Sequence, residues 1–440
     1  METKLIRTIN TPLRRIMKFE GSLKFARSFD KKDPLKQFRA QFHIPKIKGK
    51  KSVYLCGNSL GLEPRNVKSV VLEELSDWAT LAVEGHLHGK RPWLFYHHFL
   101  KKSLAKLVGA DPSEVVAMNQ LTVNLHLMLA TFYRPSAQRF KIITEAGAFS
   151  SDQYAIESQI KLQNLDPKKV WIELAPRPGE YSLRTEDILS AIRKHSDQVA
   201  LVLFGGVQYY SGQFFDIKAI SQAARKAGAY VGFDLAHAIG NVPLTLHDDG
   251  VDFAVWCSYK YLNSGPGSVA GAFVHDRHAN NFDLPRMAGW WGHQEEKRFE
   301  MKKGFKPMSG VDGWQVSNFP VLTGAAHLAS LRIFDKAGIK QIRKKSLLLT
   351  GFLDYLLRQI DSNQEKFTII TPEDPAARGC QLSILMHYQG RRVFDGLTRK
   401  GVIADWREPN VIRVAPVPLY NTFEEVYQFA HIFKNALPSK

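Results

Sequence analysis

The sequence predicts an α/β fold, with a large domain built on a mainly parallel sheet and a smaller α+β domain after it. Three observations lead to this prediction. Short apolar runs alternate with helix-like segments through the middle of the chain. One of these runs, 199–204, is apolar throughout, which is typical of a central parallel strand covered on both faces. Beyond residue 325, a long helical pattern and then short strands replace the alternation.

The large domain is predicted from the order of its elements. A segment with helical spacing begins at Asp216 and stops at Gly228. Strands are expected at 140–143, 199–204, 231–234, 251–256 and 269–274. Strands separated by helices predict a parallel sheet with helices on both faces. Ligands bind such sheets beyond the carboxyl ends of the strands.

The C-terminal part predicts a separate α+β domain. Its expected elements are a long helix over 325–360, strands at 367–370, 380–386 and 411–415, and helices at 393–400 and 422–435. The chain has 440 residues, 44% of them hydrophobic, which is enough for a large core and a smaller one. The predicted organisation is a basic N-terminal arm over 1–45, a segment joining the small domain over 46–80, the large domain over 81–325 and the small domain over 326–440.

Positive charge is concentrated at the N-terminus. The chain has a formal net charge of +18, and residues 1–51 hold 15 Lys and Arg against four Asp and Glu. Three roles are open for this basic head: a solvated arm, a mitochondrial presequence or a contact with an anionic partner. Glu2 and Glu20 are unusual in a presequence. The rest of the chain is ordinarily charged, so no nucleic-acid partner is expected.

Membrane insertion and secretion are not expected. The sequence has no run of about 18 uncharged apolar residues and no signal-peptide pattern, which favours a cytoplasmic protein. Cys56, Cys257 and Cys380 are few, scattered and in apolar surroundings. We therefore expect buried thiols in a reducing compartment and no disulfide or zinc framework.

Asp234 and Lys260 form the most informative pair in the sequence. Asp234 ends the predicted strand 231–234, and Lys260 follows 26 residues later in the apolar, aromatic run 256–263. An uncompensated ammonium would be costly there. Pyridoxal phosphate enzymes need a carboxylate that keeps the pyridinium nitrogen protonated and a lysine that holds the aldehyde as a Schiff base. The pair predicts pyridoxal phosphate as the cofactor; the alternative is a turn-capping Asp and a surface Lys.

Other segments fit the same chemistry. Thr122 is a predicted helix cap, which would present free backbone N–H groups to a phosphate. Phe149 follows a predicted strand and either stacks on a flat cofactor ring or belongs to the core. The turn 263–267 brings glycines close to the lysine. The histidine pairs 86/88 and 97/98 lack a carboxylate or cysteine partner in sequence, so no metal is expected.

Seven runs point to one family. They are 55–61 (LCGNSLG), 89–93 (GKRPW), 121–126 (LTVNLH), 233–237 (FDLAH), 257–263 (CSYKYLN), 289–293 (GWWGH) and 412–416 (IRVAP). Through these runs the chain resembles the kynureninases, which are fold-type-I pyridoxal phosphate enzymes of the aminotransferase class V superfamily. The likeness extends from about residue 45 to 435. The Asp-to-Lys element is shared across the superfamily, whereas the GNSLG, WWGH and IRVAP runs are specific to the family.

The resemblance implies hydrolysis of the Cβ–Cγ bond of L-kynurenine or 3-hydroxy-L-kynurenine. The products are anthranilate or 3-hydroxyanthranilate and L-alanine, in tryptophan catabolism and the synthesis of NAD precursors. It also implies a homodimer with active sites at the subunit interface. The preference between the two substrates does not follow from the sequence, because a single hydroxyl group decides it.

The resemblance also implies a role for each matching residue. Lys260 would hold the aldehyde, and Asp234 would pair with the pyridinium nitrogen. Tyr259 would bind the phosphate, and its place next to the lysine and the phosphate makes it the candidate for proton transfer. The other implied cofactor contacts are Leu121, Thr122, Phe149, Asp152 and His237, with Trp290 and Asn318 reaching in from the neighbouring subunit. The implied substrate contacts are Ser59, His86 and Asn318 at the aryl end, and Arg413 as a bidentate clamp on the carboxylate.

The sequence departs from the family pattern at two places, and two other functions remain open. Gly205 stands where some members have a hydroxyl residue, and the segment 94–99 has no clear counterpart. One alternative is a desulfurase-like class V enzyme, which would need a nucleophilic cysteine on a mobile polar loop. The other is a basic binding protein that has lost catalysis, against which Asp234, His237, Lys260 and Arg413 argue because all four are present.

Overall fold

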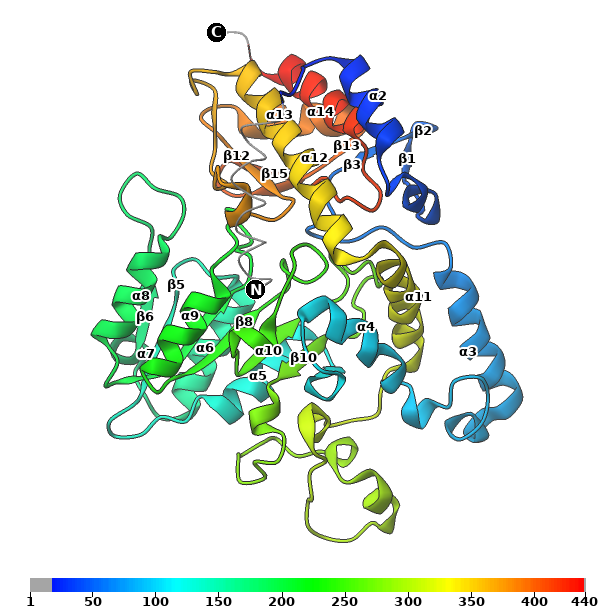
Figure 1. Cartoon of the computed structure of the whole chain (residues 1–440), viewed down its shortest axis with the longest axis vertical. Coiled ribbons are helices and arrows are strands. Elements are labelled where there is room, and N and C mark those ends of the chain that lie inside the picture. Colours follow the sequence, from blue (N-terminus) through cyan, green and yellow to red (C-terminus); the bar gives the residue numbers. More distant parts are fainter. Residues whose placement is uncertain (1–17, 439–440) are drawn as a thin grey trace. The chain divides into compact units, whose positions relative to one another are not determined.

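The structure, a computed structural model, describes residues 18–438 and forms two compact units. Unit 1 contains residues 18–59, Tyr210–Phe214 and the chain from Lys340 onward. Unit 2 contains Leu60–Tyr209 and Phe215–Ile339. Figure 1 traces both units in sequence colours. Each unit is therefore assembled from segments that are distant in the sequence.

Unit 2 is built on a seven-stranded sheet in the order β4-β10-β9-β8-β7-β5-β6. The strands β9, β8, β7, β5 and β6 are parallel, whereas β10 pairs antiparallel with both β9 and β4. The predicted α/β fold with a mainly parallel sheet is confirmed. The strands are β4 (Val115–Ala117), β5 (Lys141–Glu145), β6 (Trp171–Leu174), β7 (Val199–Gly205), β8 (Tyr230–Asp234), β9 (Phe253–Trp256) and β10 (Gly271–Val274).

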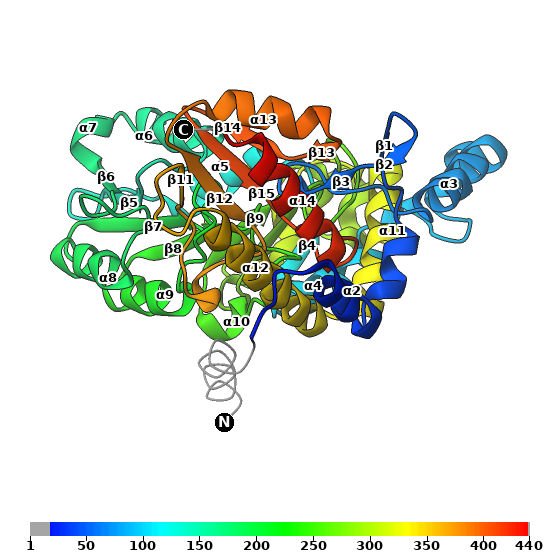
Figure 2. The same ribbon diagram turned by 90° about the horizontal axis from the view of Figure 1, so that it is seen from above.

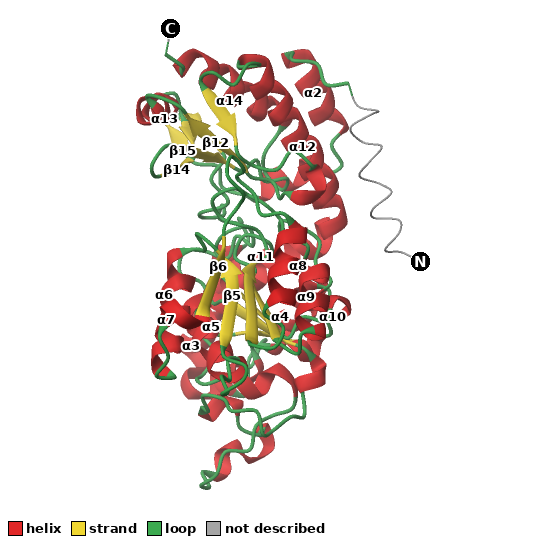
Figure 3. Ribbon diagram, turned by 90° about the vertical axis from the view of Figure 1, so that its left-hand side faces the viewer, coloured by secondary structure: helices red, strands yellow, loops and turns green. Residues whose placement is uncertain are grey.

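Helices cover both faces of this sheet. Figures 2 and 3 show α5, α6 and α7 on one face and α8, α9 and α10 on the other. The strands of the middle of the sheet are buried along nearly their whole length, which explains why their sequences are apolar throughout. The helices of unit 2 are α3 (Val67–Leu81), α4 (His98–Val108), α5 (Leu121–Phe132), α6 (Ser150–Leu162), α7 (Pro167–Val170), α8 (Thr185–Lys194), α9 (Ile217–Lys226), α10 (Leu246–Asp249) and α11 (Val321–Ala337).

Unit 1 is built on a four-stranded antiparallel sheet in the order β11-β12-β15-β14. A second, parallel pair joins β3 to β13 and so links the N-terminal segment to the C-terminal part of the chain. The strands are β1 (Lys46–Ile47), β2 (Lys50–Lys51), β3 (Val53–Tyr54), β11 (Phe367–Ile369), β12 (Leu382–Met386), β13 (Val402–Ile403), β14 (Asp405–Arg407) and β15 (Val411–Val414). The helices are α2 (Leu23–Lys32), α12 (Ile339–Ile360), α13 (Gly390–Arg399) and α14 (Phe423–Ala436).

The predicted helix over 325–360 is two helices. α11 ends at Ala337 and α12 begins at Ile339, with Gly338 between them. Gly338 has a φ of +72°, a left-handed conformation that glycine adopts without strain and that ends a helix. The first of the two helices packs on α3 and α4 and belongs to unit 2. The small unit therefore begins at Lys340, later than the expected residue 326.

The predicted basic arm is not a free arm where the structure describes it. Residues 1–17 lie outside the described residues, but 18–45 form α2 and a short 3₁₀ helix that belong to unit 1. The carboxylate of Asp30 accepts the backbone N–H groups of Phe423 and Glu424 and so caps α14. Arg39 pairs with Glu425, also in the first turn of α14. The sequence interpretation failed here because it weighed the charge of this segment and not its apolar face.

A buried ion pair fixes the same segment to α12. The Nζ atom of Lys345 lies 2.7 Å from Asp33 Oδ2 and donates to the backbone oxygen of Pro418 at 2.6 Å. Both side chains are buried, with 5% and 3% of their surface exposed. A buried charge is stable only while its partner and hydrogen bonds remain. This contact therefore joins three stretches of unit 1.

Two sequence expectations concern membranes and cysteines. Across residues 18–438, no helix combines the length and apolar character that a membrane span needs. The three cysteines form no disulfide. Cys257 and Cys380 are buried as expected, whereas Cys56 is only partly buried.

We predict that Lys345→Ala destabilises the protein by about 3–5 kcal/mol, because it leaves the Asp33 carboxylate buried without its partner. Chemical denaturation followed by circular dichroism measures this change. The matched control is Lys161→Ala, which removes a lysine from the exposed pair with Glu157 and should cost less than about 1 kcal/mol. Equal effects of the two variants would show that the buried pair adds nothing to stability.

Candidate active site

A pocket opens in unit 2 beyond the carboxyl ends of β5, β7 and β8. It encloses about 580 Å³, including the solvent space at its open mouth. Its walls come from these strand ends, the starts of α5 and α6, and the loop after β9. The lining residues are Leu121, Thr122, Glu145, Phe149, Ser151, Asp152, Gly205, Val207, Gln208, Tyr209, Asp234, Ala236, His237, Tyr259 and Lys260.

Asp234 is the last residue of β8 and is buried at the floor of this pocket. Its Oδ1 atom accepts the backbone N–H of Ala236 at 2.7 Å. Its backbone oxygen accepts the N–H of Gly206, which follows the neighbouring strand β7. The carboxylate is thus held in one orientation by the chain immediately after it.

Two more carboxylates, Glu145 and Asp152, lie close to Asp234. Burial raises the pKa of Glu145 to about 8. Burial raises the pKa of Asp152 well above its usual value, and the neighbouring charges of Asp234 and Glu145 raise it further. Burial also raises the pKa of Asp234, but its hydrogen bond with Asp152 lowers it. Asp152 therefore holds a proton more readily than Asp234, which is the more easily ionised of the pair.

Lys260 lies on the loop that leaves β9, and tight packing fixes the turn that carries it. The backbone oxygen of Lys260 accepts the N–H of Asn263, whose φ of 52° closes the turn. Gly61 packs against this turn and donates its N–H to the backbone oxygen of Tyr259 at 2.8 Å. A Cβ atom at Gly61 would lie 2.3 Å from the backbone oxygen of Lys260, so only glycine fits. This close approach explains why the GNSLG run ends in a glycine at position 61.

The amino group of Lys260 points to two other residues of the pocket. Its Nζ atom lies 3.0 Å from His237 Nε2. It also lies 5.6 Å from the centre of the Phe149 ring. His237 follows Asp234 in the segment after β8, so the strand end and the lysine loop meet at this point. A lysine, a histidine and an aromatic face thus converge with Asp234 in one pocket.

The starts of two helices form another wall. Leu121 and Thr122 are the first residues of α5, and Ser151 and Asp152 lie in the first turn of α6. The hydroxyl groups of Thr122 and Ser151 are 2.9 Å apart. The first N–H groups of a helix have no partner inside it, and they attract anions. The prediction of Thr122 as the cap is wrong, because the helix begins at Leu121 and its N-cap is Gln120, two residues before Thr122.

Five residues with expected roles do not line the pocket. Trp290, Asn318 and His86 belong to unit 2 but lie outside its lining. Trp290 and Asn318 are exposed, and the ring of His86 packs edge-on against Trp93. Ser59 and Arg413 belong to unit 1. Arg413 is buried on β15, where its guanidinium pairs with Asp405.

Several lining residues were not predicted from the sequence. Glu145 is the clearest, since it ends β5 as Asp234 ends β8. The expected strand stopped at residue 143, two residues too early, and the carboxylate was therefore overlooked. Ser151, Gln208 and Tyr209 gave no sequence signal. The glycine noted as a departure, Gly205, has a defined contact, because its N–H donates to Glu145 Oε1 at 3.0 Å.

The pocket fits a flat molecule with an anionic end and a cationic centre. Asp152 Oδ1 is buried and has no hydrogen-bond partner within the described chain. Among the described lining residues, Lys260 is the only lysine or arginine near three buried carboxylates. A positively charged ring would balance these carboxylates, and the helix starts would receive an anionic group. These are the charges of pyridoxal phosphate.

Comparison with known proteins agrees with this arrangement. The chain is 50% identical to the kynureninase of Flavobacterium psychrophilum over 422 residues, which covers 96% of this chain and 99% of that protein. It is 53% identical to the kynureninase of Myxococcus xanthus over 412 residues, which covers 93% of this chain and 96% of that protein. Residues 342–433 match a family model described as the kynureninase C-terminal domain.

Solved structures share the fold at low sequence identity. The cysteine desulfurase CsdA from Escherichia coli has a TM-score of 0.73 with 17% identity and covers 91% of this chain and 98% of that one. A cysteine desulfurase from Thermococcus onnurineus has a TM-score of 0.71 with 14% identity and covers 88% and 94%. The sequence identities with the curated relatives extend over nearly the full length of both partners. This chain belongs to the kynureninase family.

Proposed function

We propose that this protein is a pyridoxal phosphate enzyme that hydrolyses the Cβ–Cγ bond of L-kynurenine, 3-hydroxy-L-kynurenine or both. The products are anthranilate or 3-hydroxyanthranilate and L-alanine. The observation that supports this most is the identity of about half of all residues with kynureninases over 96% of the chain. The reaction places the enzyme in tryptophan catabolism, towards the precursors of NAD, and we expect it in the cytoplasm.

The cofactor, when bound, supplies an aldehyde for the lysine and the substrate amine, and a cationic ring that withdraws electrons from the substrate. Lys260 is the residue for the aldehyde, because its amino group enters the pocket between His237 and Phe149. With its amine free, Lys260 would also be the residue that moves a proton at the substrate Cα atom. His237 accepts or donates at Lys260 Nζ and orients it.

Asp234 is the residue that keeps the ring protonated. Asp234 ionises more readily than Asp152, its buried neighbour, and the backbone N–H of Ala236 holds its orientation. Asp152 supports it by donating a proton towards it. A carboxylate buried in this way interacts strongly with a cation because water does not screen the pair. Phe149 would provide an aromatic face for the ring.

Groups at the starts of α5 and α6 would bind the phosphate of the cofactor. The backbone N–H groups of Leu121 and Thr122 and the hydroxyl groups of Thr122 and Ser151 lie at the start of α5 and α6. Tyr259 also lines the pocket, and burial raises the pKa of its phenol, so the phenol stays protonated at neutral pH. A protonated phenol next to Lys260 can donate to the phosphate and return a proton to the substrate.

The substrate end depends on residues outside this pocket. Arg413 is the candidate clamp for the substrate carboxylate, with Ser59, His86 and Asn318 around the aryl group. We propose a homodimer in which Trp290 and Asn318 contact the neighbouring subunit's cofactor. Both are exposed in the single chain, which leaves them accessible to a second copy.

The other two candidate functions have less support. A desulfurase needs a reactive cysteine, but Cys257 and Cys380 are buried and burial raises the pKa of Cys56 and Cys257. A raised pKa keeps a thiol protonated and unreactive at neutral pH. A basic binding protein without catalysis would not need the buried carboxylates around Lys260, which cost folding free energy.

We predict that Lys260→Ala lowers the rate of kynurenine hydrolysis by at least about 10³-fold, because the residue that bonds the aldehyde is lost. The purified variant should also lose the yellow colour of the lysine-bound cofactor. Absorbance spectra and anthranilate fluorescence measure both effects. Lys226→Ala, an exposed lysine at the end of α9, is the matched control and should keep colour and rate. A Lys260→Ala enzyme with normal turnover would contradict the proposal.

We predict that Arg413→Gln raises the KM for kynurenine and lowers kcat/KM by about 100-fold, since a charge-assisted bidentate bond is removed. The visible spectrum of the bound cofactor should not change. Arg407→Gln is the matched control, because Arg407 also pairs with Asp405 but is about one-third exposed. If Arg413→Gln loses the cofactor while its KM is normal, Arg413 acts on the cofactor and not on the substrate.

We predict that Glu145→Gln changes the pH dependence of stability in the cofactor-free protein. The pKa of Glu145 rises from about 4.5 in the unfolded chain to about 8 in the pocket. Folding therefore becomes less favourable as the pH rises from about 4.5 through 8, by up to roughly 5 kcal/mol. The glutamine variant lacks this titration.

The measurement is the melting temperature of both proteins between pH 5 and 8.5. The variant should be close to the wild type at pH 5 and more stable than it at pH 8.5. If the melting temperatures of the two proteins change with pH in parallel across this range, the pKa of Glu145 is not raised in the folded protein.

A further inference from the structure

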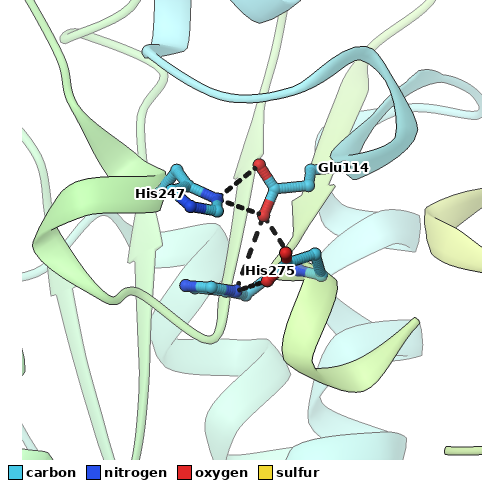
Figure 4. Close-up of side chains that lie close together, drawn as sticks. Glu114, His247 and His275 are labelled. Atoms are coloured by element: carbon cyan, nitrogen blue, oxygen red, sulfur yellow. Dashed lines mark hydrogen bonds and ion pairs between the residues drawn. The ribbon is translucent and has the colours of Figure 1, made fainter. Parts of the chain in front are cut away.

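We propose that this protein binds one divalent transition-metal ion, of the zinc type, at a site away from the pocket. Four side chains of unit 2 form this site: Glu114, His247, His275 and Asp276. Each offers one ligand atom, and these atoms all lie within 4.8 Å of one another. Figure 4 shows Glu114, His247 and His275 turned towards a common point.

The fold brings these residues together from distant parts of the sequence. Glu114 precedes β4, and β4 pairs antiparallel with β10, so Glu114 lies beside the end of β10, where His275 and Asp276 follow. His247 is in α10, whose first turn donates a backbone N–H to Gly109 near the same place. His247 and Glu114 are 133 residues apart in sequence. No local sequence motif contains these four residues, which is why no metal was expected from the sequence.

The distances between the ligand atoms suit a tetrahedral ion. Zinc bonds of about 2.0–2.1 Å place neighbouring ligands about 3.3 Å apart in a tetrahedron. The Nδ1 atom of His247 lies 3.0 Å from Glu114 Oε1, and His275 Nδ1 lies 3.5 Å from the same oxygen. His275 Nδ1 and Asp276 Oδ1 are 2.6 Å apart. These three separations lie within about 0.7 Å of the tetrahedral value, and the other three do not exceed 4.8 Å.

Two carboxylates converge on the Nδ1 atom of His275. The backbone nitrogen of Arg277 lies 3.2 Å from His275 Nδ1. The oxygens of Asp276 and Glu114 also approach it. Hydrogen bonds between His247 and Glu114 and between His275 and Asp276 hold the group together. A divalent ion at the same point would replace the protons of these hydrogen bonds and would be coordinated by the same four side chains.

The surroundings fix two of the ligands and leave two adaptable. Glu114 is fully buried, and its oxygens accept the backbone N–H groups of Asp111 and Asp276 at 2.8 Å. Hydrogen bonds of this kind orient metal ligands. The side chains of His247 and Asp276 are 36% and 51% exposed, which allows an ion to enter. With both imidazoles neutral, the two carboxylates carry two negative charges that a divalent ion balances.

The donor set indicates the type of metal. Two imidazole nitrogens with two carboxylate oxygens suit zinc, cobalt or nickel, whereas magnesium and calcium prefer oxygen ligands alone. The site lies at the end of β10 beside Asp252, which precedes β9, whereas the pocket lies at the carboxyl ends of the parallel strands. The ion would therefore join β4, α10 and the end of β10, and it would stabilise the fold without touching the substrate.

Zinc titration of the metal-stripped holoenzyme tests this proposal. We expect one Zn²⁺ per chain by mass spectrometry of the bound metal, with a dissociation constant below about 1 µM by calorimetry. Zinc should also raise the melting temperature. In His247→Ala and Asp276→Asn, zinc affinity should fall by at least about 100-fold and the thermal shift should disappear. Kynurenine turnover should be unchanged in both variants.

The matched control is His431→Ala, which removes an exposed histidine of α14 in unit 1 and should bind zinc like the wild type. The two site variants alter partly or largely exposed side chains, so they are expected to fold, and circular dichroism checks this. Zinc binding that survives in His247→Ala and Asp276→Asn would place the ion elsewhere and overturn the proposal. Absence of saturable binding to the wild type below about 10 µM would overturn it as well.

Discussion

The carboxyl ends of the parallel strands of unit 2 meet at one edge of the sheet, and the chemistry of the protein depends on this constraint. Glu145 ends β5, Gly205 ends β7 and Asp234 ends β8, so three chain segments that are far apart in sequence leave the sheet side by side. The three strands are largely buried, and β5 and β8 end in a carboxylate residue. Polar side chains can accumulate there because the backbone of the strands is already hydrogen-bonded within the sheet, and the following loops supply the remaining partners.

That edge concentrates negative charge where water is scarce. Glu145, Asp152 and Asp234 share a buried region in which the charge of Asp234 raises the cost of ionising the other two. Protein interiors tolerate such groups only when protons or a cation balance them. Lys260 supplies one positive charge, and the ring of pyridoxal phosphate would supply another. The same reasoning applies at the opposite edge of the sheet, where Glu114 and Asp276 meet two histidines. Both edges of one sheet therefore hold acidic groups that a cation from outside the chain would complete.

Unit 1 depends on a different constraint, the joining of the chain's N-terminal segment to its C-terminal part. Asp30 caps α14, Asp33 pairs with Lys345 of α12, and β3 pairs with β13. A charged segment that seems solvated in sequence is thereby held in place by its few acidic residues. The structure also explains individual glycines. Gly338 ends α11, and Gly61 leaves room for the turn that carries Lys260. In each case a conformation or a close approach excludes other residues.

The sequence by itself determined the fold class, the alternation of strands and helices, the Asp234 and Lys260 pair and, through seven short runs, the family. These properties are local or depend on the order of elements, so residues that are neighbours in the sequence are enough to recognise them. Only the tertiary structure decided which carboxylates join Asp234, where the N-terminal segment lies, and which histidines gather around Glu114. Glu145 and Asp234 are 89 residues apart, and His247 and Glu114 are 133 apart. Strand order and register bring such residues together, and neither property can be read from the residues themselves.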